Sequence, residues 1–253
     1  MQYTEGLPRQ FSWLMVAKFF DKVDSTQSRI VQWLPKTGDG AVLVVAESQT
    51  KGEGRLGRPW ISPPGGIWFT LALPLKLSLA QAAPFSLISA LQVVHALKEI
   101  NNLECEIKWP NDIIYDGKKL GGILLTTTNK FKRVWLLIGV GINVNNPIPP
   151  DLSKVATSIQ AIREQSQGRS RLIEAILLNF WTAWQDFDKT GFGPYKAAVE
   201  TVLTGVGKPM KVLSGKKSTQ GKLVGVDANG GLLLKSRSTT ATVQAGEIVG
   251  FHS

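Results

Sequence analysis

A continuous apolar run, AVLVVA at residues 41–46, constrains the fold of this 253-residue chain more than any other feature. Neither face of such a strand carries a polar side chain, so both faces must be covered, and the run predicts a strand inside a buried sheet. Similar runs at residues 67–73, 120–128 and 134–144 predict further strands. The main core is therefore expected to form on a sheet.

Two helical segments are expected to pack against that sheet. Residues 79–100 place apolar side chains on one helical face, with Pro84 in the first turn. Residues 171–187 repeat the spacing more strongly, and Ser170 is placed to act as the N-cap. The aromatic stripe of this second helix fits burial in the core better than a cofactor site.

The sequence pattern changes after about Gly205. From residue 210 to residue 251, short apolar runs alternate with turn signals, a spacing that predicts a small β-barrel. We therefore expect an α+β protein with two domains. A mixed β-sheet with packed helices is expected over residues 1–205, and a small barrel over residues 206–253.

The amino-acid composition limits the cellular compartment and the binding partners that are expected. No run of about 18 apolar residues occurs, and the apolar N-terminal stretch lacks a cleavage pattern, so we expect a cytoplasmic protein without a membrane partner. The single cysteine, Cys105, cannot form an internal disulfide, and with two histidines it predicts no protein-built metal site. The net charge of +10 favours an acidic or polyanionic partner without choosing among nucleic acid, nucleotide, membrane or protein.

The first candidate binding segment, KGEGRLGRPW, occupies residues 51–60, directly after the first predicted strand. Glycines let the backbone wrap an anion, arginines give planar charged donors, and tryptophan gives a stacking surface. The segment lacks the final Gly-Lys-Ser/Thr of a P-loop, and a flexible hairpin tip fits it as well as a phosphate clamp. The residues that would bind are Gly52, Gly54, Arg55, Arg58 and Trp60.

Two further segments place polar residues at strand ends. KWPND at residues 108–112 opens a hairpin whose turn brings Asp112 and Lys119 face to face, either as a surface ion pair or as a functional pair. GVGIN at residues 139–143 places two glycines and Asn143 at the end of an apolar strand. A β-bulge and the close approach of another group both fit that pattern.

Taken together and in this order, these segments resemble the catalytic domain of biotin protein ligases, which attach biotin to a lysine of a carrier protein. Residues 24–26 (DST) are similar to the family's biotin-contacting motif, and residues 51–60 resemble its GRGRxGRxW adenylate-binding loop. Residues 108–112 match its KWPND element letter for letter. Lys119 falls where the family's essential lysine lies, and residues 139–143 are similar to its GxGIN strand.

The resemblance implies a class II synthetase-like biotin/lipoate ligase fold followed by an SH3-like C-terminal domain from about Lys208. It also implies ATP-dependent attachment of biotin through a biotinyl-5′-AMP intermediate. The implied small molecules are biotin, ATP and Mg²⁺, with the ion screening the triphosphate. The implied protein partner is the biotin carboxyl carrier protein of acetyl-CoA carboxylase.

The resemblance also implies roles for individual residues. Lys119 would bridge the biotin carboxylate and the α-phosphate, and Arg55 and Arg58 would hold phosphates. Asp112 would orient the incoming lysine amine or accept its proton, or would only position Lys119. Trp60 and Asn143 would contact adenine. The implied binding residues are Ser25, Thr26, Gln49, Gly52, Gly54, Arg55, Arg58, Trp60, Lys119, Gly122 and Asn143.

Two alternatives and one departure accompany this interpretation. A lipoate-protein ligase shares the fold, but the Trp-Pro-Asn-Asp string and the barrel tail favour the biotin branch. A biotin-responsive DNA-binding regulator is disfavoured because only about two dozen residues precede Asp24, so no nucleic acid partner is expected. Glu53 stands where the family usually has Arg, and we expect its carboxylate to point away from the site, toward Lys51.

Overall fold

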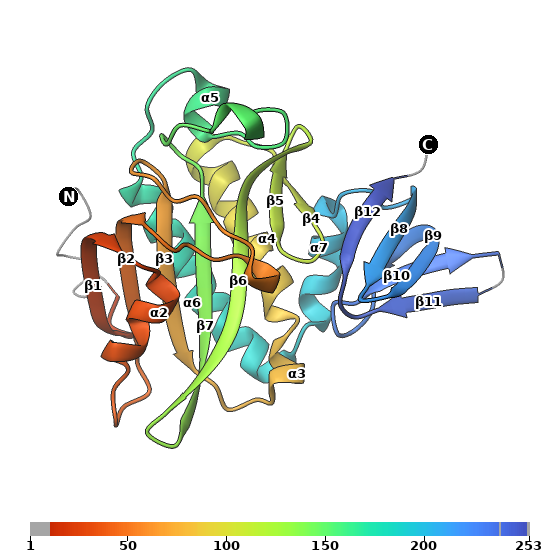
Figure 1. Ribbon diagram of the computed structural model, residues 1–253. Coiled ribbons are helices and arrows are strands. Elements are labelled where there is room, and N and C mark those ends of the chain that lie inside the picture. Colours follow the sequence, from red (N-terminus) through yellow and green to blue (C-terminus); the bar gives the residue numbers. More distant parts are fainter. Residues whose placement is uncertain (1–10, 238, 252–253) are drawn as a thin grey trace.

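The computed structural model describes residues 11–237 and 239–251 (Figure 1). Its larger part is a seven-stranded sheet with the order β1-β2-β3-β7-β6-β5-β4. β1 and β2 are parallel, and every other neighbouring pair in this sheet is antiparallel. The strands are β1 (Leu14–Val23), β2 (Ala41–Gln49), β3 (Ile67–Pro74), β4 (Glu106–Lys108), β5 (Asp112–Tyr115), β6 (Lys118–Lys130) and β7 (Arg133–Ile142).

The β2 strand is buried on both faces, as its sequence predicts. Residues 41–46 are fully inaccessible to solvent. Leu43 and Val45 point into the main core, whereas Val42 and Val44 belong to a smaller apolar cluster on the other face, which includes Trp135. Because successive side chains of a strand alternate between its faces, one apolar run supplies two separate apolar layers.

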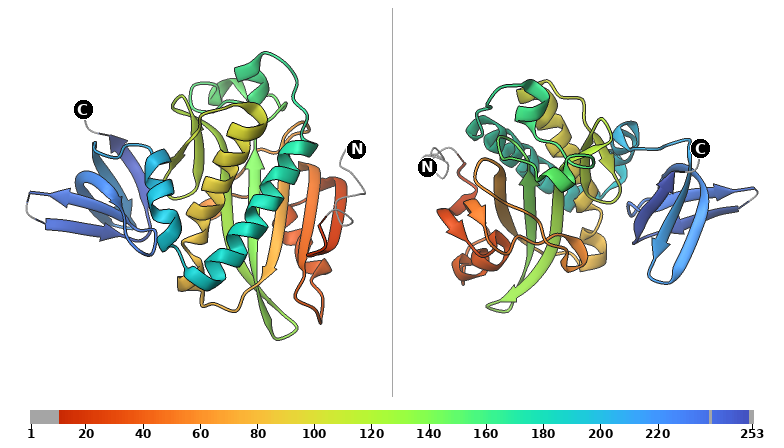
Figure 2. Two further views of the ribbon diagram at one scale, coloured as in Figure 1. Left: turned by 180° about the vertical axis from the view of Figure 1, so that it is seen from behind. Right: turned by 45° about the horizontal axis from the view of Figure 1, so that its top comes forward.

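Two long helices, α4 (Phe85–Asn101) and α6 (Ser170–Thr190), cover one face of the sheet (Figure 2). The aromatic stripe of α6 is core: Phe180 lies 6.4 Å from Phe69 of β3, centroid to centroid, and Trp184 lies 5.0 Å from Phe85 of α4. The short helix α2 (Thr26–Ile30) lies on the opposite face. The other α-helices of the described residues are α3 (Leu79–Ala82), α5 (Ile159–Arg163) and α7 (Lys196–Val202).

Two details of the predicted helices are wrong. The segment expected to form one helix over residues 79–100 forms α3 and α4, and Pro84 is the N-cap of α4 rather than a residue of a first turn. Proline has no N–H to donate to the preceding turn, so the first helix ends before it. Ser170 is the first residue of α6, because Arg169 already has helical backbone angles and is the N-cap.

The α3–α4 segment also tests the expectation that no part of the chain spans a membrane. Residues Ala80–Asn101 are long and apolar enough to cross a bilayer by length and composition. However, 72% of their most apolar window is buried inside the protein. We therefore interpret this segment as part of the protein core.

The C-terminal part is a five-stranded antiparallel sheet with the order β11-β10-β9-β8-β12. Gly205 and Gly207, with φ of 83° and 84°, make the turn that leads into it. The expected β-rich C-terminal part is confirmed, although no pairing joins β11 to β12 among the described residues. The 205/206 boundary stays a prediction. The strands are β8 (Pro209–Ser214), β9 (Lys217–Val226), β10 (Leu232–Ser236), β11 (Thr239–Val243) and β12 (Glu247–Phe251).

One buried and one partly buried hydrogen bond join this smaller sheet to the larger part. The indole N–H of Trp109 donates to the carbonyl of Gly230 at 2.9 Å. The carboxylate of Glu200, on α7, accepts from the backbone N–H of Val226 at 2.9 Å. Trp109 belongs to the KWPND segment, so the C-terminal part is hydrogen-bonded to one of the predicted binding segments.

We expect Phe180→Ala to lower the free energy of unfolding by about 3–5 kcal/mol, because it empties a fully buried ring position between the sheet and α6. Leu178→Ala is the matched control, since Leu178 lies on the same helix and is 53% exposed. The control should change stability by less than about 1 kcal/mol. Urea unfolding of both variants would contradict this packing if their losses were equal.

Candidate active site

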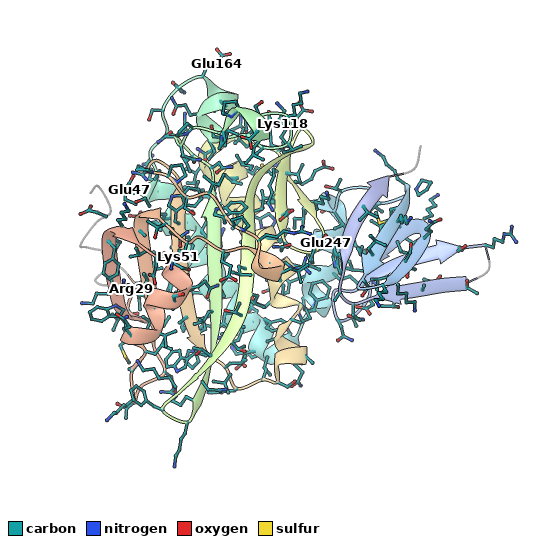
Figure 3. All side chains as sticks on the ribbon, in the orientation of Figure 1. Arg29, Glu47, Lys51, Lys118, Glu164 and Glu247 are labelled. Carbon is teal, nitrogen blue, oxygen red and sulfur yellow. The ribbon has the colours of Figure 1, made fainter. Side chains whose placement is uncertain are left out.

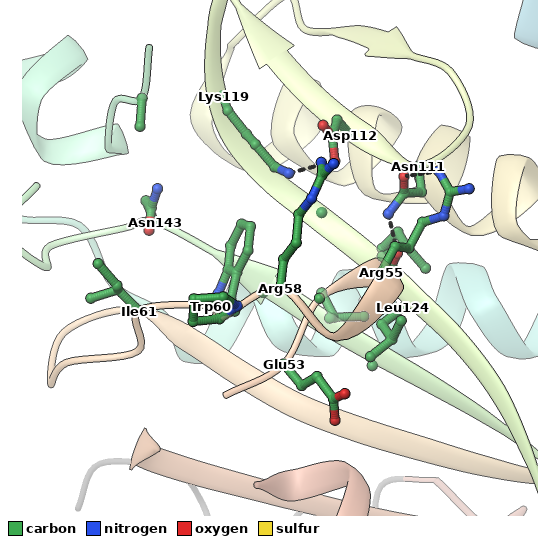
Figure 4. Close-up of a pocket in the computed structure, with 18 of the residues that line it drawn as sticks. Glu53, Arg55, Arg58, Trp60, Ile61, Asn111, Asp112, Lys119, Leu124 and Asn143 are labelled. Atoms are coloured by element: carbon green, nitrogen blue, oxygen red, sulfur yellow. Dashed lines mark hydrogen bonds and ion pairs between the residues drawn. The ribbon is translucent and has the colours of Figure 1, made fainter. Parts of the chain in front are cut away.

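A cavity of about 570 Å³ opens on the sheet face opposite α4 and α6, over β6 and β7. Figure 4 shows side chains from the residue 51–60 loop, the β5–β6 hairpin and the end of β7 meeting in it. Segments far apart in the sequence are therefore brought together as predicted. The predicted residues that line it are Ser25, Thr26, Gln49, Gly54, Arg55, Arg58, Trp60, Asp112, Lys119, Gly122 and Asn143.

Gly52 is the one predicted site residue that does not line the cavity. A Cβ on Gly52 would lie 2.4 Å from the carbonyl oxygen of Trp60 and 2.6 Å from Ser62 Oγ. The backbone N–H of Trp60 donates to the Gly52 carbonyl at 2.8 Å. Only glycine therefore lets the loop fold back on itself here, and its role is to shape the loop rather than to face a ligand.

The loop forms a hairpin-like arch over the cavity. The backbone N–H of Gly54 donates to the carbonyl of Arg58 at 2.8 Å, and Leu56, at the tip, has a φ of 58°. Glu53 is exposed and projects away from Lys119 and Asp112 in Figure 4, but it still lines the cavity, so the expectation that it points away from the site is not confirmed. The expected partner is wrong, because no ion pair between Glu53 and Lys51 forms within the described residues.

Lys119 and Asp112 form an ion pair at the cavity wall, with 2.6 Å between Nζ and Oδ1. In the hairpin register Lys119 pairs with Ile114, and a β-bulge next to Ile114 sets Asp112 opposite Gly122, yet the side chains of Lys119 and Asp112 still meet. The backbone of Lys119 is held from its other side, because its N–H donates to Val155 and its carbonyl accepts from Thr157. The predicted pair is therefore present on a doubly anchored backbone.

Trp60 lies on a floor made by the glycines of β6 and β7. A Cβ on Gly141 would lie 2.6 Å from the indole nitrogen of Trp60, and the Lys119 ammonium lies 5.0 Å from its ring centroid. β7 pairs with both neighbours without a register shift, so a β-bulge does not explain its glycines. At Gly139 a Cβ would lie 2.7 Å from Gln27 Nε2, so a neighbouring side chain approaches this glycine closely too. Close approach is therefore the correct interpretation of this motif.

The two loop arginines already have partners. Arg55 Nη1 donates to Asn111 Oδ1 at 3.4 Å, while Arg58 pairs with Glu247 of β12 at 2.7 Å. Glu247 lies on the side of the smaller sheet that faces the larger part (Figure 3). The Arg58 side chain is 65% exposed, so this pair contributes little to stability. Burial lowers the pKa of Arg55, and the carboxylates of Asp112 and Glu247 partly oppose that shift.

Neutral polar side chains line the other end of the cavity. Thr26 and Ser25 sit at the start of α2 and are almost fully buried. Gln49, at the end of β2, accepts hydrogen bonds from the backbone N–H and the hydroxyl of Thr26. Its amide nitrogen donates to Ser62 Oγ at 2.8 Å. This end therefore suits an uncharged polar group, whereas the loop end suits an anion.

Some residues that line or support this cavity were not predicted from the sequence. Asn146 is 3% exposed, and its amide donates to Asn143 Oδ1 at 3.0 Å. Asn143 in turn donates to the carbonyl of Thr157 at 3.0 Å, so this pair holds the segment that fixes Lys119. Asn146 was detectable only as a second asparagine after the GVGIN string. Asn111, Ser62 and Glu247 carried no local signal for the contacts described above.

Comparison with known proteins identifies the family of this chain. A model of the Biotin/lipoate A/B protein ligase family matches residues 19–143. The chain is 34% identical over 235 residues to the bifunctional ligase/repressor BirA of Bacillus subtilis, covering 91% of this chain and 72% of that protein. The chain belongs to the biotin protein ligase family.

Other relatives agree with this membership. The ligase is 29% identical over 240 residues to the biotin–acetyl-CoA-carboxylase ligase of Paracoccus denitrificans, covering 90% of this chain and 97% of that one. A structure of biotin protein ligase from Aquifex aeolicus in complex with biotin and ATP superposes with a TM-score of 0.79 at 32% identity, over 94% and 98% of the two chains. The expected α+β fold of a mixed sheet with packed helices is thereby confirmed.

We expect Gly141→Ala to destabilise the ligase by about 1–3 kcal/mol, because the new Cβ overlaps the Trp60 indole and forces the loop to move. Gly168→Ala is the matched control, since a Cβ there meets nothing within 4 Å. Thermal unfolding of the two variants checks the difference. Equal stabilities would mean that Trp60 does not rest on Gly141 in solution.

Proposed function

We propose that this ligase attaches biotin to a lysine of a biotin carboxyl carrier protein, with ATP as the energy source and biotinyl-5′-AMP as the intermediate. The observation that carries the proposal is the Lys119–Asp112 pair beside Trp60, in a cavity with an anion-binding end and a neutral polar end. Relatives named for biotin ligation, and a relative's structure with biotin and ATP, support it.

In the first step, a carboxylate oxygen of biotin attacks the α-phosphorus of ATP and pyrophosphate leaves. Two anions must approach each other, so a cation between them lowers the barrier. Lys119 is our choice for that cation, because its ammonium faces the cavity and its backbone is fixed on both sides. Arg55 and Arg58 would hold phosphate oxygens at the loop end, with Trp60 and Asn143 near adenine.

In the second step, the amine of the carrier lysine attacks the carbonyl carbon of the mixed anhydride and AMP leaves. The attacking nitrogen must lose a proton, and a carboxylate at hydrogen-bond distance can accept it. We assign this role to Asp112, which lines the cavity beside Lys119. Ser25, Thr26 and Gln49 would bind the uncharged ureido ring of biotin, and Gly122 leaves room for it against β6.

We further propose that magnesium reaches this site bound to the triphosphate. No group of three or more His, Cys, Asp or Glu side chains suited to a metal occurs in residues 11–237 and 239–251. Mg²⁺ commonly binds through substrate phosphates, waters and one or two carboxylates, so the residues fit an ion carried by ATP. When bound, it would screen the phosphate charge, while the side chains named above orient the reactants.

The remaining expectations are also proposals. We propose a cytoplasmic location, acetyl-CoA carboxylase as the source of the carrier, and an SH3-like domain over residues 206–253. The net charge of +10 supports an acidic carrier surface as partner. The five-stranded antiparallel sheet of the C-terminal part supports the SH3-like assignment.

We expect Lys119→Ala to slow formation of biotinyl-5′-AMP by about a hundredfold or more, because the approaching anions lose their shared cation. Biotin-dependent exchange of pyrophosphate into ATP measures this step. Lys118→Ala is the matched control, since Lys118 is the exposed neighbour in the same hairpin. Exchange at a wild-type rate in Lys119→Ala would refute the assigned role, and no exchange in the wild-type protein would refute the function.

A further inference from the structure

A chain of hydrogen bonds runs behind the neutral end of the cavity. Thr70 Oγ1 of β3 lies 2.8 Å from Thr26 Oγ1, which lies 3.1 Å from Gln49 Oε1. Gln49 Nε2 lies 2.8 Å from Ser62 Oγ, which lies 3.1 Å from the carbonyl oxygen of Trp60. Four side chains thus connect the floor of the sheet to the arch of the loop.

The direction of this chain is fixed at both ends. The backbone N–H of Thr26 can only donate, and it points to Gln49 at 2.8 Å, so that atom of Gln49 is its carbonyl oxygen. The Thr26 hydroxyl therefore donates to the same oxygen. At the other end, the carbonyl of Trp60 can only accept, so Ser62 donates to it and receives the amide N–H of Gln49.

Thr70 completes the arrangement without facing the cavity. It is 0% exposed and is absent from the cavity wall, whereas Thr26 lines it. Gly139 lies directly opposite Thr70 on β7 and has no side chain to offer another partner. The Thr70 proton therefore goes to Thr26, and the proton of Thr26 goes to Gln49.

These hydrogen bonds limit what the hydroxyl oxygen of Thr26 can still bind. A threonine hydroxyl has one proton and two acceptor positions. Its proton is used on Gln49, and one acceptor position is filled by Thr70. What remains is a single acceptor position. A buried acceptor of this kind penalises a ligand that brings no donor to it.

We propose that Thr70 is a positioning residue for ligand specificity: while Gln49 takes the Thr26 proton, the Thr70 hydroxyl fills one acceptor position of Thr26 and holds the other toward the ligand, which selects a ligand ring that carries an N–H donor. The inference rests on the proposed function, because the ureido ring of biotin carries N–H groups and the dithiolane ring of lipoate carries none. A site built to accept from an N–H rejects analogues that lack it more strongly than apolar shape alone can.

The test compares ligand binding by calorimetry in the 253-residue ligase and its variants. The ligands are biotin, the two cyclic carbamate analogues in which one or the other ureido N–H is replaced by oxygen, and lipoate. Thr70→Val removes the hydroxyl at nearly constant volume, and Thr70→Ser restores it. Ser89→Ala is the matched control, since Ser89 is also fully buried and its hydroxyl has no partner among the described residues.

We expect the wild-type ligase to bind biotin more tightly than one of the carbamates, by about tenfold. Thr70→Val should weaken biotin binding by about three- to tenfold and leave that carbamate nearly unaffected, so the selectivity largely disappears. Thr70→Ser should keep most of the selectivity, and Ser89→Ala all of it. Should Thr70→Val fail to fold, Thr70→Ala removes the same hydroxyl without adding a methyl group next to Thr26.

Three results would overturn the proposal. Unchanged biotin binding in Thr70→Val would mean that Thr70 does not act through Thr26. An equal loss for biotin and for both carbamates would mean that Thr70 only supports the fold. Binding of lipoate but not biotin by the wild-type ligase would overturn the proposed function together with this inference, which distinguishes that failure from the first two.

Discussion

The burial of β2 on both faces stops at Ala46, and the site depends on where it stops. Residues 41–46 are buried between two apolar layers. The last residues of the strand therefore leave the core at a fixed place and in a fixed direction. Glu47 there accepts from Arg169 and from the backbone of Gly65, and Gln49 bonds to Thr26. The polar end of an otherwise apolar strand thereby anchors both the loop and the start of α2.

The charged and the neutral side chains of the cavity come from different structural elements and line different ends of it. The cations Arg55, Arg58 and Lys119 come from the glycine-rich loop and the β5–β6 hairpin, and each has a polar partner within the protein. The neutral end comes from α2 and β2, where hydroxyls and one amide satisfy each other. Trp60 lies on Gly141 and beside Lys119, so its ring belongs to the wall next to the charged end.

Much of this arrangement could be predicted from the sequence where its cause is local. The two-sided burial of β2, the aromatic face of α6 and the meeting of Asp112 with Lys119 follow from patterns a few residues long. The break at Pro84 was not predicted, and the N-cap of α6 was misplaced by one residue, because helix ends depend on backbone angles that neighbouring side chains decide.

The remaining features depend on contacts between residues that are far apart in the chain. Nothing near Arg58 indicates that Glu247 will lie beside it, and nothing near Trp109 indicates Gly230. The glycines of β7 were noticed, but a choice between a bulge and a close approach required the position of Trp60. Ser62 and Thr70 are ordinary residues in sequence and acquire a role only through their hydrogen bonds.

The double anchoring of Lys119 has a further consequence for how the site meets a reactant. Its backbone N–H and carbonyl are both occupied by the segment that follows Asn146, so its main chain cannot drift when a ligand arrives. The only freedom left is rotation about the bonds of the side chain. The conformational entropy of the Lys119 backbone is therefore lost during folding and not when the ligand binds. The ligand meets an ammonium group that has few conformations left to lose.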